Sequence, residues 1–344
     1  MNPRKKVRIA LIGVESFRGK ELKSVLEDKK FPIEKIEFFD PDVEKEYSKL
    51  TEFRGEPRVV MPLDEAAIAD SDLVFLASDE KTNREYGNLA PKKKFLAIDL
   101  SETFNVDKKV PVVVGGVNHK TVLEKKPALI ANPHPVTIIL AHFLNVICEK
   151  FHPRNIAAFV LQPASAFGEA GIEELADQSF AVLNSSSVSK KTFKTQVAFN
   201  LLSESTPLDK DGFSAVEKQV LSEIGRVIDI RNLSLSIAII QVPVFHTYSI
   251  MIHLELREKT DIPTLTALFK KSPYFKVASP SPTHPVSCLR VAGKDKIYIG
   301  QIKKEDSSLR KYWVWTVTDN LTIGSALNAY EILESSQLSL HTKR

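Results

Sequence analysis

The sequence is poor in several features, and each shortage excludes a class of protein. It has only two cysteines in 344 residues, Cys148 and Cys288. So few cysteines predict no disulfide framework and no zinc site, and we expect no metal. Basic and acidic residues nearly cancel, 47 against 43, which argues against a dedicated nucleic-acid surface. No apolar run approaches the roughly 18 residues that a membrane span requires.

These shortages predict a globular protein in a reducing compartment. The first residues, "MNPRKKV", run directly into a strand-like apolar segment and lack the features of a signal peptide. We therefore expect a cytoplasmic protein that contacts neither membrane nor nucleic acid. The length predicts two domains or one large one.

Strands and helices alternate in the first 130 residues. Apolar strand patterns lie at 7–13, 33–40, 71–78, 94–101, 110–118 and 128–133, with helical patterns at 19–28 and 82–92. Such alternation is typical of a parallel sheet with helices on both faces. We predict an α/β, Rossmann-type domain.

The turn after the first strand is where a dinucleotide phosphate would bind, and its sequence is "GVESFRG". Gly13 and Gly19 occupy the outer glycine positions, but Ser16 replaces the middle glycine that lets backbone approach a pyrophosphate. Glu15 adds a charge that repels phosphate, which Arg18 could offset. Two interpretations stay open, a weak cofactor site and a plain strand–turn–helix corner, and we favour the corner.

Two other residues also have a chemical and a structural interpretation. Asp40 follows the second strand, where an acid could accept a hydrogen bond from a ribose hydroxyl, but Asp40-Pro41-Asp42 also predicts a turn. Cys148 lies in the helical pattern 136–151, and we expect a core residue rather than a reactive thiol. We favour the structural interpretation of both.

After residue 133, strands and helices are separated along the chain. Helical patterns lie at 136–151, 171–183, 214–228, 261–275 and 321–335, and strand patterns at 155–162, 233–256, 296–305 and 311–320. This arrangement predicts an α+β domain with a mixed or antiparallel sheet whose face is free to dimerise.

Seven segments between Ile9 and Glu334 resemble, in order, the aspartate-β-semialdehyde dehydrogenase family. They are "IALIGVESFRGKEL", "DLVFLAS", "AIDLSETFNVDKKVPVVVGGVN", "IANPHPVTI", "GEAGIEELADQ", "QVPVFHTYS" and "VTDNLTIGSALNA". The subgroup most similar to this chain is its noncatalytic, dehydrogenase-like (Usg-type) homologues. The resemblance implies a homodimer with a Rossmann-like nucleotide-binding domain at 1–132, an α+β substrate and dimerisation domain at 133–319, and a C-terminal helix, 320–344, packing back on the first domain.

That family, which serves amino-acid biosynthesis, reduces an acyl phosphate to an aldehyde with NADPH through a cysteine thioester. Its nucleophile motif is Asn-any-(Asn/Ser)-Cys; here Asn132 matches, but Pro135 stands at the cysteine position. Tyr248 replaces the histidine that acts as acid and base. Gln241 replaces the arginine that binds the substrate carboxylate.

At the other family positions, some residues differ from those of the family and others match them. Asn105 stands where the phosphate-binding arginine is expected, and Gln219 replaces a lysine, beside the retained Glu217 and the adjacent Lys218. The resemblance implies vestigial substrate positions at Asn105, Gln241, Glu217, Lys218 and Ser165, vestigial cofactor positions at Gly13, Ser16, Gly19, Asn320 and Gly324, and a retained Gln162. Asp319 and Asn320 also have a structural interpretation as the cap of the last helix.

With nucleophile, base and cations all replaced, the sequence predicts a noncatalytic pseudoenzyme with a ligand- or protein-binding role. The alternative is an NAD(P)-dependent oxidoreductase that acts on an aldehyde or acyl phosphate by altered chemistry, with His134, His246 or Tyr248. The resemblance implies NADP or NAD as cofactor, but the weak glycine turn leaves none assigned. A hetero-association with an active family member is a further hypothesis.

Overall fold

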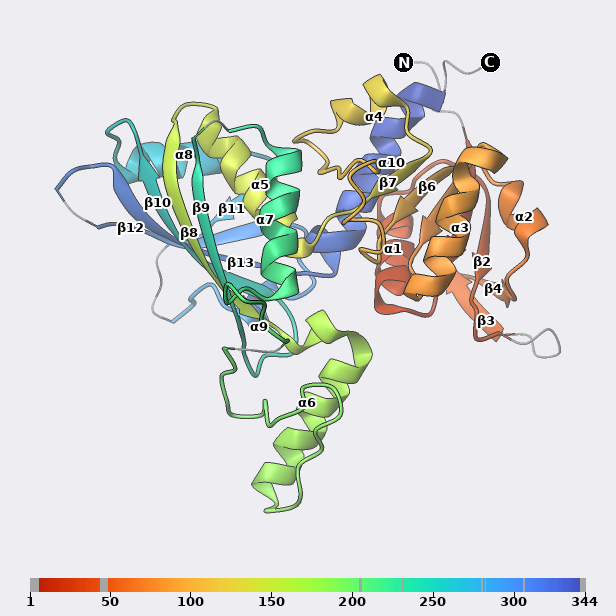
Figure 1. Cartoon of the computed structure of the whole chain (residues 1–344), viewed down its shortest axis with the longest axis horizontal. Helices are drawn as coiled ribbons and strands as arrows, with labels where there is room; N and C mark the ends of the chain where they lie inside the picture. Colours follow the sequence, from red (N-terminus) through yellow and green to blue (C-terminus); the bar gives the residue numbers. More distant parts are fainter. Residues whose placement is uncertain are drawn as a thin grey trace. The chain divides into compact units, whose positions relative to one another are not determined.

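The structure is a computed structural model that describes residues 6–43, 49–203, 206–230, 232–279, 281, 283–305 and 307–340, without side chains for 337–340. The chain divides into two compact units (Figure 1). Unit 1 comprises the chain up to His134 together with the segment from Ser325 onward, and unit 2 comprises Pro135–Gly324. The boundaries expected at 132/133 and 319/320 for folding domains stay predictions.

Unit 1 is built on a seven-stranded sheet of order β3-β4-β2-β1-β5-β6-β7. The strands are β1 (Val7–Ile12), β2 (Ile33–Phe39), β3 (Lys49–Phe53), β4 (Glu56–Met61), β5 (Leu73–Leu76), β6 (Leu96–Asp99) and β7 (Leu129–Ala131). All neighbours are parallel except the antiparallel β3–β4 hairpin. The central strands are buried on both faces, as expected of a sheet covered by helices. The predicted Rossmann-type α/β fold is confirmed.

Three of the helices described in unit 1, α1 (Phe17–Asp28), α2 (Glu65–Ala69) and α3 (Glu80–Lys93), begin at short polar residues that cap them. The unit also contains α4 (Lys120–Lys125) and α10 (Leu327–Leu340). Ser16, Asp64 and Asp79 each accept a hydrogen bond from a backbone N–H in the first turn that follows. The last helix, α10, packs against α1 and α4.

The strand predicted at 110–118 is wrong. The segment makes one isolated bridge, Val112 to Ala131, and otherwise turns. Gly116 adopts a left-handed φ of 71°. The side chain of Asn118 accepts from the Val114 N–H at 2.7 Å and donates to the Val112 carbonyl at 2.9 Å, so it takes the place of a neighbouring strand.

Unit 2 is built on a six-stranded mixed sheet of order β11-β12-β13-β10-β8-β9. The strands are β8 (Pro153–Gln162), β9 (Ser234–Gln241), β10 (Tyr248–Leu256), β11 (Phe275–Val277), β12 (Ile297–Lys304) and β13 (Lys311–Thr318). The helices are α5 (Pro135–Cys148), α6 (Gly168–Leu183), α7 (Ala215–Val227), α8 (Ile262–Lys271) and α9 (Cys288–Val291). Helices α5, α7 and α8 pack against β8, β9 and β12 respectively. The predicted mixed α+β architecture is confirmed.

The buried helix α5 shows where the core of unit 2 ends. Eleven of its residues, between Val136 and Ile147, are buried. Cys148 closes the helix and is exposed, as are Glu149 and Lys150 after it. The prediction that Cys148 is a core residue is therefore wrong, because the buried part of α5 ends at Ile147, one residue earlier.

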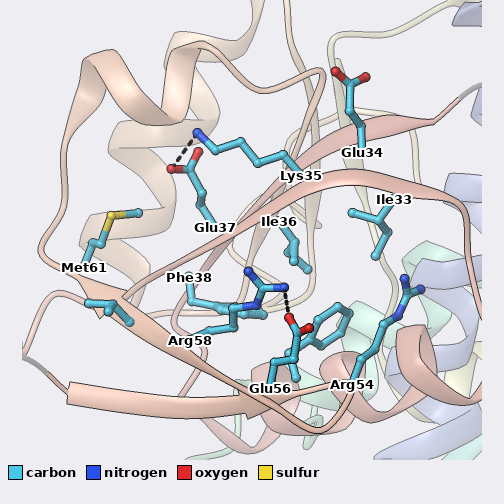
Figure 2. Close-up of a pocket in the computed structure, with 12 residues that line it drawn as sticks. Ile33, Glu34, Lys35, Ile36, Glu37, Phe38, Arg54, Glu56, Arg58 and Met61 are labelled. Atoms are coloured by element: carbon cyan, nitrogen blue, oxygen red, sulfur yellow. Dashed lines mark hydrogen bonds and ion pairs between the residues drawn. The ribbon is translucent and has the colours of Figure 1, made fainter.

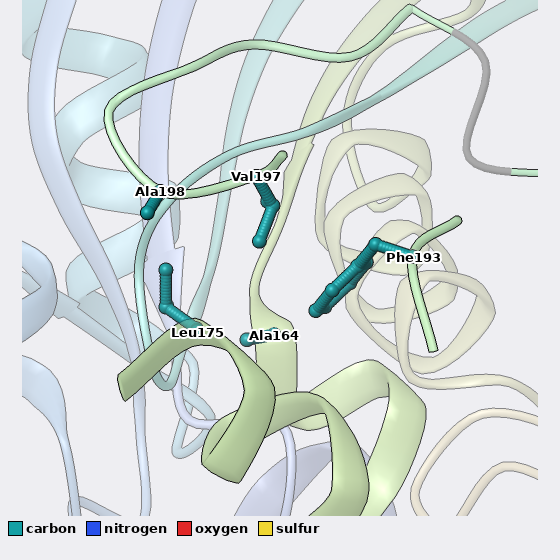
Figure 3. Close-up of a cluster of buried hydrophobic side chains, with 5 residues drawn as sticks. All are labelled: Ala164, Leu175, Phe193, Val197 and Ala198. Carbon is teal, nitrogen blue, oxygen red and sulfur yellow. The ribbon is translucent and has the colours of Figure 1, made fainter. Parts of the chain in front are cut away.

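Helix α6, drawn in green in Figure 1, belongs to a lobe with its own small core. Figure 3 shows that cluster, which consists of Ala164, Leu175, Phe193, Val197 and Ala198. The buried side chain of Gln178 fastens the following loop, because it accepts from the N–H groups of Val197 and Ala198 at 2.7 and 3.1 Å. A buried amide thus satisfies backbone that no strand pairs.

Across the described part of the chain, no helix is both long enough and apolar enough to cross a bilayer.

Candidate functional site

The corner after β1 needs both of its glycines for packing. Gly13 has a φ of 82°, and a Cβ there would lie 2.6 Å from the carbonyl carbon of Ala77. A Cβ on Gly19 would lie 2.2 Å from the carbonyl oxygen of Gly13. Gly13 is therefore explained by the close approach of the backbone after β5, and Gly19 by the close passage of α1 over the end of β1, without any ligand.

Ser16 caps the start of α1 with its own side chain. Its hydroxyl accepts from the Gly19 N–H at 3.0 Å and donates to the Gly13 carbonyl at 2.8 Å. Free N–H groups at a helix start are what bind a phosphate in a dinucleotide site. The serine occupies one of them, where a glycine would leave it open.

The charges around this corner are paired with one another. The Arg18 guanidinium lies 2.7 Å from the Glu102 carboxylate, and Lys49 lies 3.2 Å from Glu15. Asp40 accepts from the backbone N–H of Asp42 at 3.2 Å, as the predicted turn requires, and also from that of Glu15 at 3.4 Å. The arginine that could have offset Glu15 is thus held by another acid.

The loop after β6 contains the segment "SETFN", which the resemblance predicts at the family's phosphate-binding position. The buried Asp99 organises this loop. This carboxylate accepts from the N–H groups of Ser101 and Phe104, both at 2.9 Å. Burial raises the pKa of Asp99, and the hydrogen bonds from Ser101 and Phe104 act in the opposite direction. Glu102, inside this loop, has a left-handed φ of 69°.

Three buried asparagines join this loop to β7 and α10 within unit 1. The Asn105 side chain donates to the Asn132 carbonyl at 3.3 Å. The Asn132 side-chain oxygen accepts from the Asn328 amide at 2.7 Å, which also donates to the Val113 carbonyl at 3.0 Å. Two family positions are therefore brought together, and the amides hold α10 to the sheet.

Pro135, at the cysteine position, is the first residue of α5. Proline suits that place because its fixed φ is helical and its missing N–H would be unpaired there anyway. A Cβ on Gly324 would lie 2.9 Å from the Pro135 Cβ, so glycine is required for the two segments to meet within unit 2. His134 just before the proline is buried.

Gln162, Tyr248 and Gln241, which the sequence predicts at the positions of the family's glutamine, histidine and arginine, form one hydrogen-bonded chain in unit 2. The Tyr248 hydroxyl donates to the Gln162 side-chain oxygen at 3.3 Å. The Gln162 amide donates to the Gln241 side-chain oxygen at 3.1 Å, and the Gln241 amide donates to the Val242 carbonyl at 3.1 Å. All three side chains are buried, with at most 4 % of their surface exposed. The group is neutral, and its members satisfy one another.

His246 does not stand on the strand that carries Tyr248. β10 begins at Tyr248, and Thr247 before it has a left-handed φ of 77°. The strand pattern predicted over 233–256 is therefore interrupted before Tyr248, and His246 lies outside both strands. His246 is half-buried in the preceding loop.

Asp319 and Asn320 have different tasks. Asp319 accepts from the N–H groups of Leu321 and Thr322 at 2.9 and 3.0 Å, as a capping residue does. The Asn320 side chain instead accepts from Ser165 Oγ at 3.3 Å and from the Thr247 N–H at 3.1 Å. The prediction that Asn320 is part of the cap is wrong.

The acid and lysine positions at the start of α7 are used structurally. Glu217 forms a capping box with Ser214 and also accepts from the Ile239 N–H of β9 at 2.9 Å. Lys218 pairs with Asp209. Gln219, at the lysine position, donates to Glu223 at 2.8 Å.

Sequence reasoning missed several members of these networks. Asp99, Asn328 and Glu223 are buried polar residues, and each takes part in at least one hydrogen bond described above. The available signal for Asp99 was its place at the carboxyl end of a predicted parallel strand, where site residues gather. No comparable signal marks Asn328 or Glu223, which lie within helical patterns.

Comparison with known proteins identifies the chain over most of its length. Residues 8–125 match the semialdehyde dehydrogenase NAD binding domain, and residues 144–323 match the semialdehyde dehydrogenase dimerisation domain. The fold is similar to a crystal structure of aspartate semialdehyde dehydrogenase II from Vibrio cholerae, with a TM-score of 0.90 and 23 % identity, covering 99 % of this chain and 100 % of the other.

Two relatives illustrate the similarity in sequence. Aspartate-semialdehyde dehydrogenase from Rickettsia conorii is 28 % identical, over 96 % of this chain and 97 % of the relative. A USG-1 protein homolog from Azotobacter vinelandii is 26 % identical, over 95 % and 97 %. These matches confirm the predicted family: the chain belongs to the semialdehyde dehydrogenase family, with aspartate-semialdehyde dehydrogenases among its relatives.

Proposed function

We propose that this chain is a member of the family that does not carry out acyl-phosphate reduction and acts by binding. The observation that supports this most is the neutral chain Tyr248–Gln162–Gln241, in which each side chain is buried and donates to a neighbour. A substrate carboxylate would find no cation there, since glutamine cannot form the charged fork that arginine offers.

The chemistry at the other positions supports the same proposal. A thioester mechanism needs a thiolate, and Pro135 has no nucleophilic atom. Tyrosine, with an unperturbed pKa near ~10, is a poor base at neutral pH, and the Tyr248 hydroxyl already donates to Gln162. The alternative is an oxidoreductase that uses His134, His246 or Tyr248, and a Tyr248 that acts as a base would have to give up its donation to Gln162.

The test is a direct assay with aspartate semialdehyde, phosphate and NADP, following NADPH. The reference is a variant of an active family enzyme that lacks its catalytic cysteine. We expect this chain to show no more turnover than that reference. Turnover well above it would overturn the proposal.

We further propose that the turn between β1 and α1 of unit 1, from Gly13 to Gly19, has a structural role only and binds no dinucleotide tightly. The support is the Ser16 cap and the pairing of Arg18 with Glu102. Thermal unfolding with NAD, NADP, ATP and AMP tests this, because a ligand at one hundred times its Kd stabilises by about 2.7 kcal/mol. A clear shift with one nucleotide would contradict the purely structural role and name the ligand.

We also propose a homodimer formed through the outer face of the unit 2 sheet. Phe159, Met251 and Trp315 are direct cross-strand neighbours on β8, β10 and β13, and Phe159 is 46 % exposed. A row of large apolar side chains on an open sheet face favours an interface. Sedimentation of Met251→Asp should give monomer, whereas wild type should give dimer. An unchanged dimer would place the interface elsewhere.

A hetero-association with an active family member, and a cytoplasmic location, stay hypotheses. Co-purification from cells that carry both proteins tests the first, and finding only homodimers would count against it.

A further inference from the structure

The sheet of unit 1 contains an opening between β2 and β4. The two strands pair only at Phe38 with Val60 and at Phe39 with Met61. Before these pairs, β2 continues along β1 and β4 continues along β3, so the two strands separate. The result is a cavity of about 530 Å³, lined by residues of β2, β3, β4 and the hairpin turn (Figure 2).

The opening is closed at both ends. At one end stand the β2–β4 pairs, and at the other stands Arg54 at the tip of the β3–β4 hairpin. The Arg54 guanidinium donates to the Phe31 carbonyl at 2.6 Å, and its backbone N–H donates to Glu27. Because the hairpin tip is tied to the end of α1 and to the segment before β2, the cavity suits a small molecule rather than a passing strand.

Arg54 is the lining cation that carries no carboxylate partner. Lys35 pairs with Glu37 at 2.9 Å, and Arg58 pairs with Glu56 at 2.5 Å. Figure 2 shows the Arg58–Glu56 pair within the lining. Among the residues that the structure describes, no carboxylate lies within 4.0 Å of the Arg54 guanidinium nitrogens.

The guanidinium is also held in place. Its carbon lies 5.2 Å from the centre of the buried Phe53 ring, and one nitrogen is fixed on Phe31. A guanidinium has five N–H donors, so several stay available. Beside them, Ile33, Ile36 and Phe53 supply apolar surface to the cavity. An oriented guanidinium next to apolar surface is suited to a carboxylate with a hydrocarbon tail.

We propose that this cavity binds a small amphipathic carboxylate. The carboxylate accepts from the Arg54 guanidinium, and the hydrocarbon part lies along Ile33 and Ile36. The site runs toward the amino ends of β2 and β4, whereas a parallel sheet binds nucleotide beyond the carboxyl ends of its strands. It is therefore separate from the corner at Gly13 and does not depend on the function proposed above.

Titration calorimetry and saturation-transfer NMR with hexanoate test the proposal on the full chain. Hexan-1-ol and hexylamine are the matched controls, because they keep the tail and replace the carboxylate. We expect hexanoate to bind with a Kd on the order of 1 mM. Hexanol should bind about tenfold more weakly, as loss of one charge-assisted contact predicts, and hexylamine should not bind.

Variants then locate the binding. Arg54→Gln should weaken hexanoate about tenfold, and Arg58→Gln, whose arginine is already paired with Glu56, should leave the Kd within about twofold. Ile36→Ser should weaken hexanoate and hexanol alike. It also keeps the proposal testable if an Arg54 variant fails to fold.

Three results would overturn the proposal. They are equal binding of hexanol and hexanoate, undiminished hexanoate binding by folded Arg54→Gln, and unchanged binding of both probes by Ile36→Ser.

Discussion

The residues predicted at family site positions are bonded to their neighbours in different ways in the two units. In unit 1 the nucleotide-type corner is closed by a serine cap and by charge pairs that reach the surface, with Arg18 and Glu102 side chains 35 % and 18 % exposed. In unit 2 the positions at Gln162, Gln241 and Tyr248 are closed by neutral hydrogen bonds between buried side chains. The groups in unit 1 are charged and partly exposed to solvent, whereas those in unit 2 are neutral and buried.

That difference sets how firmly each closure holds. Surface ion pairs contribute about 0–1 kcal/mol, so single substitutions can reopen the corner of unit 1 at small cost. Leaving a buried polar group unpaired costs about 1–3 kcal/mol, and burying an unpaired charge costs more. Restoring family residue types should therefore be tolerated in unit 1 and resisted in unit 2.

The largest expected effect comes from placing an arginine at position 241 in unit 2. Gln241→Arg puts a charge where the glutamine is fully buried, and we expect a loss of about 4 kcal/mol of unfolding free energy. Gln241→Met, of similar length and uncharged, should lose only about 1–2 kcal/mol. Urea unfolding of both variants measures the difference. Equal stability would mean that water reaches this site and that the closed network is misjudged.

Next is the packing of the corner in unit 1. Gly13→Ala combines a left-handed φ with a Cβ 2.6 Å from backbone, and should cost about 3 kcal/mol. Gly55→Ala is the matched control, because Gly55 has a φ of 73° but nothing within 4 Å of a Cβ, so it should cost about 1 kcal/mol. Chemical unfolding compares the two. Similar losses would show that the close approach of the Ala77 backbone is not what requires Gly13.

The two units should also differ in how their stability depends on pH, and this difference is smaller than the effects above. Burial lowers the pKa of His142, in α5 of unit 2, from 6.5 to about 3. The unfolded chain therefore binds more protons below about pH 6.5, and stability falls with acidification, by about 2 kcal/mol between about pH 7.5 and pH 5. Burial raises the pKa of Asp99 in unit 1, so acidification does not weaken unit 1 through that group.

Hydrogen exchange measures the unfolding free energy of unit 2 across this pH range, and it checks that this free energy falls as the pH falls. His142→Phe keeps a ring to stack on Tyr274, whose ring centre lies 3.8 Å from that of His142, and it should flatten the dependence. A dependence that survives the substitution would assign it to another group.

The smallest effect should follow from the cap of α1. Ser16→Ala removes the acceptor for the Gly19 N–H and should cost about 1 kcal/mol, while Ser16→Gly should cost only a few tenths. Thermal unfolding of the two variants gives the order. If alanine is no worse than glycine, the serine hydroxyl contributes nothing to the corner.

The sequence predicted those helices and strands that are marked by a pattern of apolar residues within their own segment. The apolar strands of unit 1 and the long helix α5 follow directly from runs of apolar residues, and the corner at Gly13 follows from its glycines. The hairpin β3–β4 was not predicted, because its exposed strands mix charges with few apolar residues and pair only with each other and with the end of β2. The strand predicted at 110–118 failed because a single side chain, Asn118, competes for its backbone.

The residues of the candidate site come from matching motifs and stay predictions. The motifs single out Pro135, Gln241 and Tyr248, but no pattern in the sequence reveals that Gln162 joins two of them into one chain. The strand pattern predicted over 233–256 is interrupted because Thr247 takes a left-handed φ, which a β-branched residue rarely adopts. Hydrogen bonds between residues far apart in sequence are set by the fold.

The central claim is that this chain has no thiol-dependent reductase chemistry. The most direct measurement is NADPH formation from aspartate semialdehyde, phosphate and NADP by wild type and by the double variant Cys148→Ser/Cys288→Ser, which removes both thiols in the sequence. We predict that both proteins give the rate of buffer alone. Turnover by wild type that the double variant loses would contradict the account, because it would show that a cysteine elsewhere has replaced the one absent at Pro135.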